Sequence, residues 1–271
     1  MNEFQVVKNK KIKLSQVDAN DCGKWEGKKK QAKERFKNLV KKLDELQERL
    51  YAENKHKVLL VLQAVDSGGK DGTIRAVFEG VNPQGVRIAN FKVPSEIELD
   101  HDYLWRIHNQ VPGKGEIVIF NRSHYEDVLV VRIHELVPQK VWEKRFQQIV
   151  EFERMLYEEG TLILKFYLHI NREEQKKRFL ERLENPRKQW KFNPKDIAER
   201  KRWDEYMQAY EDAINETSTD FAPWFVIPAN YNWYRNLVVT ETIVEKLEGL
   251  NMKYPLFEGD SEEFRKQIQS S

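Results

Sequence analysis

A glycine-rich stretch at residues 66–73 has the composition of a loop that binds phosphate groups. It directly follows an apolar run at residues 58–65, leads into a helical pattern, and has the sequence Asp66-Ser67-Gly68-Gly69-Lys70-Asp71-Gly72-Thr73. Glycines allow backbone N–H groups to converge on phosphate oxygens, the start of the helix adds positive potential, and Lys70 can reach the outer phosphates. This context predicts a phosphate-binding loop. The alternative is a tight strand-to-helix turn with an incidental lysine.

The loop departs from the usual GxxxxGK[ST] pattern of phosphate loops. Ala64 stands in place of the first glycine, and Asp71 follows Lys70 where Ser or Thr is usual. Asp66, inside the loop, would place a carboxylate beside bound phosphate, an arrangement that is favourable if the carboxylate holds Mg²⁺. We therefore expect the loop to bind phosphate together with a divalent cation.

A second polar cluster follows the apolar run at residues 117–120, with the sequence Asn121-Arg122-Ser123-His124-Tyr125-Glu126-Asp127. Ligands of open parallel sheets bind at the carboxyl ends of the strands, so this cluster can face the loop. Arg122 can donate two hydrogen bonds to phosphate, Asn121 can orient a metal-bound water, and Glu126 adds a carboxylate. For Arg122 and Glu126 the alternative is a surface ion pair. We expect His124 to be structural, although a phosphohistidine role stays open.

Five short apolar runs predict the strands that must position these clusters. The runs are nearly continuous rather than alternating, as is typical of strands covered on both faces. They lie at residues 58–65, 86–91, 116–121, 162–170 and 224–227. Helical patterns separate them, and Ser95 with Glu98 forms a capping box while Asn193-Pro194 begins another helix. The alternation predicts an α/β fold in three layers, with a parallel sheet flanked by helices.

The start of the chain is expected to lie outside this α/β unit. Residues 1–30 are polar and rich in lysine, and we interpret them as an arm on the surface. Residues 31–51 carry apolar side chains at helical spacing, which predicts an amphipathic helix. We predict a single domain over residues 31–271.

Composition excludes several classes of function. The 46 Lys and Arg balance 44 Asp and Glu to a net charge of +2, which argues against general binding of nucleic acid. A single cysteine, Cys22, excludes an intramolecular disulfide. We see no signal peptide and no apolar stretch long enough to span a membrane, so the expected location is the cytoplasm.

The basic charge is concentrated at residues 171–202, which contain twelve Lys and Arg and six Asp and Glu. This segment lies between the fourth and fifth predicted strands, where an ordinary connection would be shorter. We predict a lid of helices over about residues 171–215. The alternative is a solvated helix pair.

Both polar clusters closely resemble the Walker A and Walker B regions of the polyphosphate kinase 2 family. The similarity is carried by the Gly-Lys-Asp-Gly-Thr form at residues 69–73 and the Asn-Arg-Ser-His-Tyr-Glu-Asp form at residues 121–127. Further matches are Phe91-Lys92-Val93-Pro94, Gln175-Lys176-Lys177-Arg178-Phe179 and Trp190-Lys191-Phe192. The resemblance spans about residues 30–250.

The resemblance implies a P-loop kinase fold and phosphoryl transfer, dependent on Mg²⁺ or Mn²⁺, between inorganic polyphosphate and AMP or ADP, with GMP and GDP as further acceptors. ATP is a product, and a homo-oligomer (dimer or tetramer) is expected, without nucleic acid or membrane partners. Many family members have Asp where this chain has Asn121, and similar members with Asn and Glu126 include some that act on both AMP and ADP. The alternatives are an ATP-dependent kinase of a nucleotide or small molecule and, less compatible with the charge, a non-catalytic nucleic-acid-binding P-loop protein.

By position, the resemblance also assigns roles to individual residues. The expected catalytic residues are Asp66, Lys70, Arg122 and Arg178, and the expected metal ligands are Asp66, Asn121 and Glu126. The expected phosphate- and nucleotide-binding residues are Ser67, Gly68, Gly69, Asp71, Gly72, Thr73, Arg75, Lys92, Asn121, Tyr125, Glu126, Asp127, Arg132, Lys176, Lys177, Arg187, Lys188 and Lys191.

Overall fold

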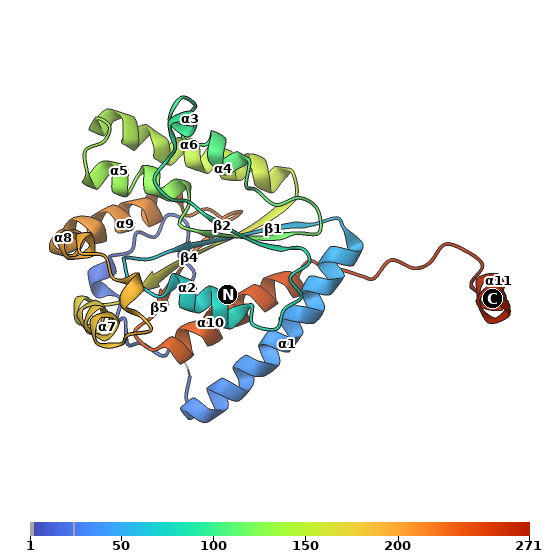
Figure 1. Ribbon diagram of the computed structural model, residues 1–271. Coiled ribbons are helices and arrows are strands. Elements are labelled where there is room, and N and C mark those ends of the chain that lie inside the picture. The colour runs from blue at the N-terminus through green and yellow to red at the C-terminus, as the bar shows by residue number, and fades with distance from the viewer. Residues whose placement is uncertain (1–2, 24) are drawn as a thin grey trace.

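The computed structural model describes residues 3–23 and 25–271 (Figure 1). Within these residues, five parallel strands form one sheet in the order β2-β3-β1-β4-β5. They are β1 (Lys57–Gln63), β2 (Val86–Asn90), β3 (Ile117–Asn121), β4 (Thr161–His169) and β5 (Trp224–Pro228). Each begins and ends within two residues of a predicted apolar run. The prediction of a parallel sheet is confirmed.

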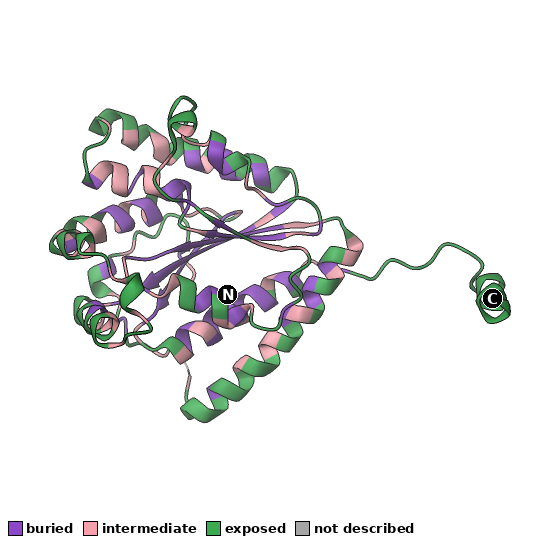
Figure 2. Ribbon diagram, in the orientation of Figure 1, coloured by how far each residue is buried: buried purple, intermediate pink, exposed green. Residues whose placement is uncertain are grey.

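Helices cover both faces of the sheet, as its apolar strands require. Figure 1 shows α1 (Lys29–Glu53), α2 (Lys70–Val77) and α10 (Asn232–Glu248) on one face, and α6 (Gln139–Glu158) and α9 (Trp203–Thr217) on the other. Figure 2 shows buried residues concentrated in the sheet and on the helix surfaces that face it. Because β1 lies between β3 and β4, the carboxyl ends of β1 and β3 are neighbours.

The described part of the chain also contains shorter elements. They are α3 (Glu96–Leu99), α4 (Trp105–His108), α5 (Val130–Ile133), α7 (Arg172–Glu184), α8 (Lys195–Lys201), α11 (Ser261–Ser270) and 3₁₀ turns at Leu14–Gln16, His124–Asp127 and Gln189–Lys191. The predicted capping box is present: Ser95 Oγ accepts a hydrogen bond from Glu98 N, and the Glu98 carboxylate accepts one from Ser95 N. The basic segment contains α7, α8 and the turn between them.

The N-terminal segment is more closely integrated than the predicted surface arm. Gln5 forms an antiparallel bridge with Phe225 of β5. Val6 N donates to Trp224 O at 2.8 Å, and the side chain of Leu14 is only 2% exposed. The apolar residues among the lysines therefore attach this segment to the outer edge of the sheet, a contact that the interpretation as a surface arm did not include.

The C-terminal segment leaves the body of the protein after α10. Figure 1 shows α11 at the end of an extended connection, away from the sheet and its helices. All residues of α11 are exposed. None of the helices in residues 3–23 and 25–271 is both long and apolar enough to cross a membrane.

A buried polar network links β4 to α6 and α9. Lys165 Nζ lies 2.6 Å from Glu153 Oε2 and donates hydrogen bonds to Thr217 O at 2.8 Å and Tyr125 Oη at 2.9 Å. The Tyr125 hydroxyl donates to Glu153 Oε1 at 2.9 Å, and His124 Nε2 lies 3.2 Å from the same oxygen. Buried ions require such partners. His124 thus has the structural place expected of it.

Candidate active site

The loop between β1 and α2 brings its backbone close to a neighbouring side chain. Gly69, which precedes α2, has a φ of 106°, a left-handed conformation that favours glycine. A Cβ at this position would also collide with the guanidinium group of Arg235. Glycine at residue 69 therefore allows both the left-handed turn and the close approach of Arg235.

Lys70, the first residue of α2, folds back over the loop, where Nζ donates a hydrogen bond of 2.7 Å to Ala64 O. Burial lowers the pKa of Lys70 and the charge of Arg122 lowers it further, whereas nearby carboxylates, of which Asp66 acts most strongly, raise it. Lys70 is therefore a partly desolvated cation at the start of a helix, where backbone N–H groups also favour an anion.

Asn121 and Arg122 leave β3 directly beside the loop. Asn121 Nδ2 donates to Asp71 Oδ1 at 2.8 Å, and Arg122 Nη2 lies 3.3 Å from Asp66 Oδ1. Burial acts to lower the pKa of Arg122, but Glu126 and Asp66 outweigh it and raise the pKa. The two polar clusters of the sequence thus lie side by side at the carboxyl ends of β1 and β3.

Two cavities adjoin these residues, and Asp66, Lys70 and Arg122 line both of them. The larger has a volume of about 1180 Å³, and its described lining contains eleven Lys and Arg but only five Asp and Glu. The smaller has a volume of about 290 Å³ and is lined by Glu126 and Tyr210, among others. A strongly basic cavity beside a smaller one can bind two anionic substrates on either side of the same cations.

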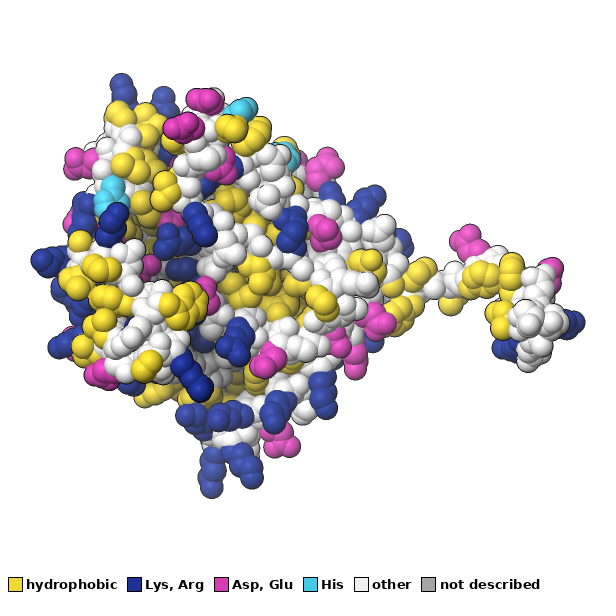
Figure 3. All heavy atoms as spheres, viewed as in Figure 1, with side chains coloured by type: hydrophobic (Ala, Val, Ile, Leu, Met, Phe, Trp, Pro, Cys, Tyr) yellow, Lys and Arg dark blue, Asp and Glu magenta, His cyan; other side chains and the backbone are white. Residues whose placement is uncertain are grey.

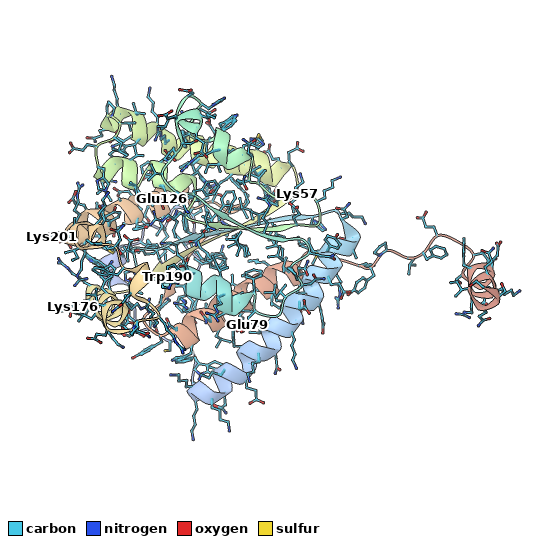
Figure 4. The ribbon with its side chains drawn as sticks, viewed as in Figure 1. Lys57, Glu79, Glu126, Lys176, Trp190 and Lys201 are labelled. Atoms are coloured by element: carbon cyan, nitrogen blue, oxygen red, sulfur yellow. The ribbon has the colours of Figure 1, made fainter. Side chains whose placement is uncertain are left out.

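Most of the predicted site residues line the larger cavity. They are Asp66, Ser67, Gly68, Gly69, Lys70, Asp71, Gly72, Lys92, Asn121, Arg122, Lys177, Arg178, Lys188 and Lys191. In Figure 4, Glu126 and Trp190 lie at the side of the sheet opposite Lys57, where β1 begins. Figure 3 shows Lys and Arg side chains gathered over α7 and α8 and at the end of α1.

Three predicted residues contact other side chains of the protein and do not line either cavity. Tyr125 is 0% exposed within the network of Lys165 and Glu153, which is at odds with its expected contact with substrate. Asp127 pairs with Arg145 at 3.1 Å, and burial raises the pKa of Asp127 to about 6 although Arg145 opposes this shift. Arg132 pairs with Asp212 at 2.7 Å and lies over the ring of Trp142.

Four further predicted residues are absent from the described lining of both cavities: Thr73, Arg75, Lys176 and Arg187. Thr73 is buried, and its hydroxyl donates to Gly69 O at 3.0 Å, which stabilises the first turn of α2. The other three side chains are exposed. Figure 4 shows Lys176 on the outer side of α7.

Arg178 reaches the loop, but its donors are directed to the protein itself. Its Nη1 donates to Ser67 O at 3.0 Å and Gly68 O at 3.1 Å, and its Nη2 donates to Ala229 O at 2.7 Å. Its Nε donates to Glu174 Oε1 at 2.8 Å. In this arrangement Arg178 holds the carbonyl side of the loop in place.

Residues 26–255 match the sequence model of the family described as Polyphosphate kinase 2. The chain belongs to this family. It is 60% identical to the AMP/ADP-polyphosphate phosphotransferase of Meiothermus ruber, over 97% of this chain and 98% of the relative. It is 43% identical to the ADP-polyphosphate phosphotransferase of Rhodopseudomonas palustris, over 92% and 93% of the two chains. The crystal structure of polyphosphate kinase 2 from Arthrobacter aurescens TC1 superimposes with a TM-score of 0.95 at 40% identity, covering 99% of this chain and 95% of that one.

The cavity of this polyphosphate kinase 2 family member also contains residues that our sequence analysis missed. Lys29 and Lys33 from the first turns of α1 line it, as does Arg235 from α10. The spacing of the two lysines by four residues places them on one face of a helix, a signal that the sequence does carry. Arg235 follows no motif; its one signal is a lone cation among buried apolar residues such as Leu237 and Val238.

The carboxylates of the site suit a cation that is shared with substrate. Within the described residues there is no group of three or more His, Cys, Asp or Glu that could hold a metal ion by itself. Mg²⁺ in phosphoryl-transfer enzymes is typically bound by one or two carboxylates together with substrate phosphates. Asp66, which is 31% exposed, and Glu126 line the smaller cavity, and Asn121 lies beside Asp71. This donor set fits such a shared ion.

Proposed function

We propose that this protein transfers phosphoryl groups between inorganic polyphosphate and AMP or ADP, forming nucleoside di- and triphosphates. The proposal is supported by membership of the polyphosphate kinase 2 family and by the Meiothermus ruber relative, whose name specifies both acceptors. The single structural observation that carries it is the pair of cavities that share Asp66, Lys70 and Arg122. The larger, basic cavity suits a long polyanion, and the smaller one suits a nucleotide with its terminal phosphate toward the shared residues.

The chemistry requires alignment and charge neutralisation rather than a covalent nucleophile. An oxygen of the acceptor phosphate attacks the terminal phosphorus of polyphosphate, and the bond to the bridging oxygen breaks, so that the chain is shortened by one unit. Lys70 and Arg122 neutralise negative charge that develops on the transferred group. Bound Mg²⁺, or Mn²⁺, would supply further positive charge, with Asp66 and Glu126 as carboxylate ligands and Asn121 as a ligand or an anchor for metal-bound water.

An assay with purified protein tests this proposal directly. We expect protein, Mg²⁺, polyphosphate and AMP to yield ADP and then ATP, detected by chromatography, and addition of EDTA to stop the reaction. Parallel reactions with GMP or GDP would show whether guanine nucleotides are also acceptors. Transfer that occurs only from ATP to AMP, with polyphosphate inert, would instead indicate an ATP-dependent nucleotide kinase.

Two neighbouring lysines of α7 provide a matched test of the larger cavity. Lys177 lines it, whereas Lys176 is exposed outside it. We expect Lys177→Ala to raise KM for long-chain polyphosphate about fivefold at low salt. This factor corresponds to the loss of a solvent-exposed charge contact that contributes ~1 kcal/mol. The effect should shrink with added salt because exposed charges are screened.

Lys176→Ala serves as the control and is expected to leave KM unchanged. The comparison uses initial rates with tripolyphosphate and with long-chain polyphosphate at two ionic strengths. Equal effects of the two substitutions, or equal effects on short and long donors, would place both lysines on a solvated helix face and contradict the assignment of the cavity.

In addition, we propose a cytoplasmic location and a homo-oligomer, either a dimer or a tetramer. Light scattering coupled to size-exclusion chromatography measures the oligomeric state.

A further inference from the structure

Arg235 is a buried cation at the phosphate loop for which the described chain provides no anionic partner. The residue is only 3% exposed, lies on α10 and lines the larger cavity. Its Nε and Nη2 donate to Asn236 Oδ1 at 3.0 and 2.8 Å, and Nη1 donates to Asn232 Oδ1 at 2.9 Å. Both partners are neutral amides. No ion pair involves Arg235 in the described part of the chain, and a buried charge without one is unfavourable.

The guanidinium group is directed at the first turn of α2. It touches the position at which a Cβ of residue 69 would lie, and Nη2 is 3.6 Å from the corresponding position at residue 72. A guanidinium group carries five N–H donors, and the two amides account for three of them, so that one N–H on each Nη remains. These two donors are near the backbone that is expected to bind phosphate.

The other arginine at the loop is different in this respect. Arg178 has a carboxylate partner in Glu174 and directs its remaining donors to backbone carbonyl groups. Burial lowers the pKa of Arg235 to about 9, with the positive charge of Arg178 adding to the effect. The surroundings thus disfavour the positive charge on Arg235, and a bound anion would stabilise that charge.

We propose that Arg235 binds a phosphoryl group of the substrate held by the loop, and that this anion is the missing partner of its buried charge. The inference deepens the proposed function and rests on it, because it requires a phosphate chain at the loop. The phosphate can belong to inorganic polyphosphate or to a nucleoside triphosphate, since both present the same oxygens. A guanidinium group with one free N–H bond on each Nη suits either.

The test combines ligand affinity with the stability of the free protein. Arg235→Met is expected to raise the Kd for inorganic tripolyphosphate, measured by calorimetry, about 30-fold or more, as loss of a buried charge contact does. Arg235→Lys retains the positive charge but loses the planar pair of guanidinium donors, and we expect it to raise the Kd about 5- to 10-fold. Without ligand, the Tm of both variants should equal or exceed that of the wild type, because an unpaired cation is removed or made easier to solvate. The same titrations with ATP show which source of phosphate uses Arg235.

Arg145→Met is the matched control, because Arg145 is a partly buried arginine that has a carboxylate partner, Asp127, and lies outside both cavities. It should show the opposite result, with a lower Tm and an unchanged Kd. If either Arg235 variant binds both ligands as tightly as the wild type, or if both lose stability without ligand, Arg235 is a structural residue and the inference is overturned. Wild-type protein that binds neither ligand and transfers no phosphate would instead overturn the proposed function itself.

Discussion

Replacing Lys70 with alanine is expected to lower kcat/KM for phosphoryl transfer about 10²- to 10³-fold, which corresponds to ~3–4 kcal/mol of transition-state stabilisation. Lys70 lies at the start of α2, lines both cavities, and is a partly desolvated cation whose Nζ reaches only a backbone carbonyl, Ala64 O, as a hydrogen-bond acceptor in the described chain. An ammonium group in this position can follow the charge from the donor to the acceptor phosphate. The measurement is the initial rate of ADP and ATP formation from AMP and polyphosphate.

The fold should survive this substitution, since Lys70 fills no part of the apolar core. We therefore expect the Tm and the far-UV circular dichroism of Lys70→Ala to match those of the wild type. Lys114→Ala is a suitable control, because Lys114 is exposed and lies outside the described lining of both cavities. A Lys70 variant that keeps more than a tenth of wild-type activity would rule out the assignment of the phosphate loop.

Removal of one partner of the buried Lys165–Glu153 pair is expected to lower the free energy of unfolding by ~3–5 kcal/mol. Both side chains are 0% exposed, so Lys165→Met leaves the Glu153 carboxylate buried without its principal counter-charge. Burial alone would raise the pKa of Glu153, but Lys165 and His124 outweigh it and hold that pKa below its usual value. The contribution of the Glu153 carboxylate is thus present at neutral pH and is lost as the pH falls through the lowered pKa.

Urea unfolding at pH 7, followed by tryptophan fluorescence, measures this loss. The double variant Lys165→Met/Glu153→Leu removes both charges and should be at least as stable as Lys165→Met, because an apolar pair leaves no buried ion without a partner. A double variant that is less stable than both single variants would show that the polar network stabilises the protein by more than the pairing of these two charges. Activity is not expected to change in proportion, since neither Lys165 nor Glu153 lines either cavity.

Four strands of this fold were predictable because they are nearly continuous apolar runs that pack between two layers of helices, whereas β2, at the edge of the sheet, is less buried. The N-terminal segment was not predictable, because the partner of Gln5 and Val6 is β5, more than 200 residues away in the sequence. No local pattern reveals such a pairing. The lysines of this segment suggested solvent, whereas a few apolar residues such as Leu14 determine its position.

In the candidate site, too, local sequence patterns located some residues, whereas contacts between distant parts of the chain determine the position of others. The loop residues and Asn121 and Arg122 were predictable, because strand order and the direction of parallel strands bring them together. Tyr125 was misplaced because the backbone turns after Arg122, which has a φ of 64°, and sends the side chain of Tyr125 toward Lys165. Arg235 could not be located, since only the packing of α10 against α2 brings it to Gly69.

The attachment of the N-terminal segment to β5 covers an edge of the sheet that could otherwise pair with another chain. An exposed edge strand is a template for pairing with other chains, and β5 is an apolar strand with all five residues buried. Two backbone hydrogen bonds occupy its outer edge: Val6 N donates to Trp224 O, and Phe4 O accepts from Val226 N. Residues 4–6, which line neither cavity, thereby prevent the edge of β5 from pairing with another chain. Loss of this segment is expected to expose the edge of β5 and to favour its pairing with another chain.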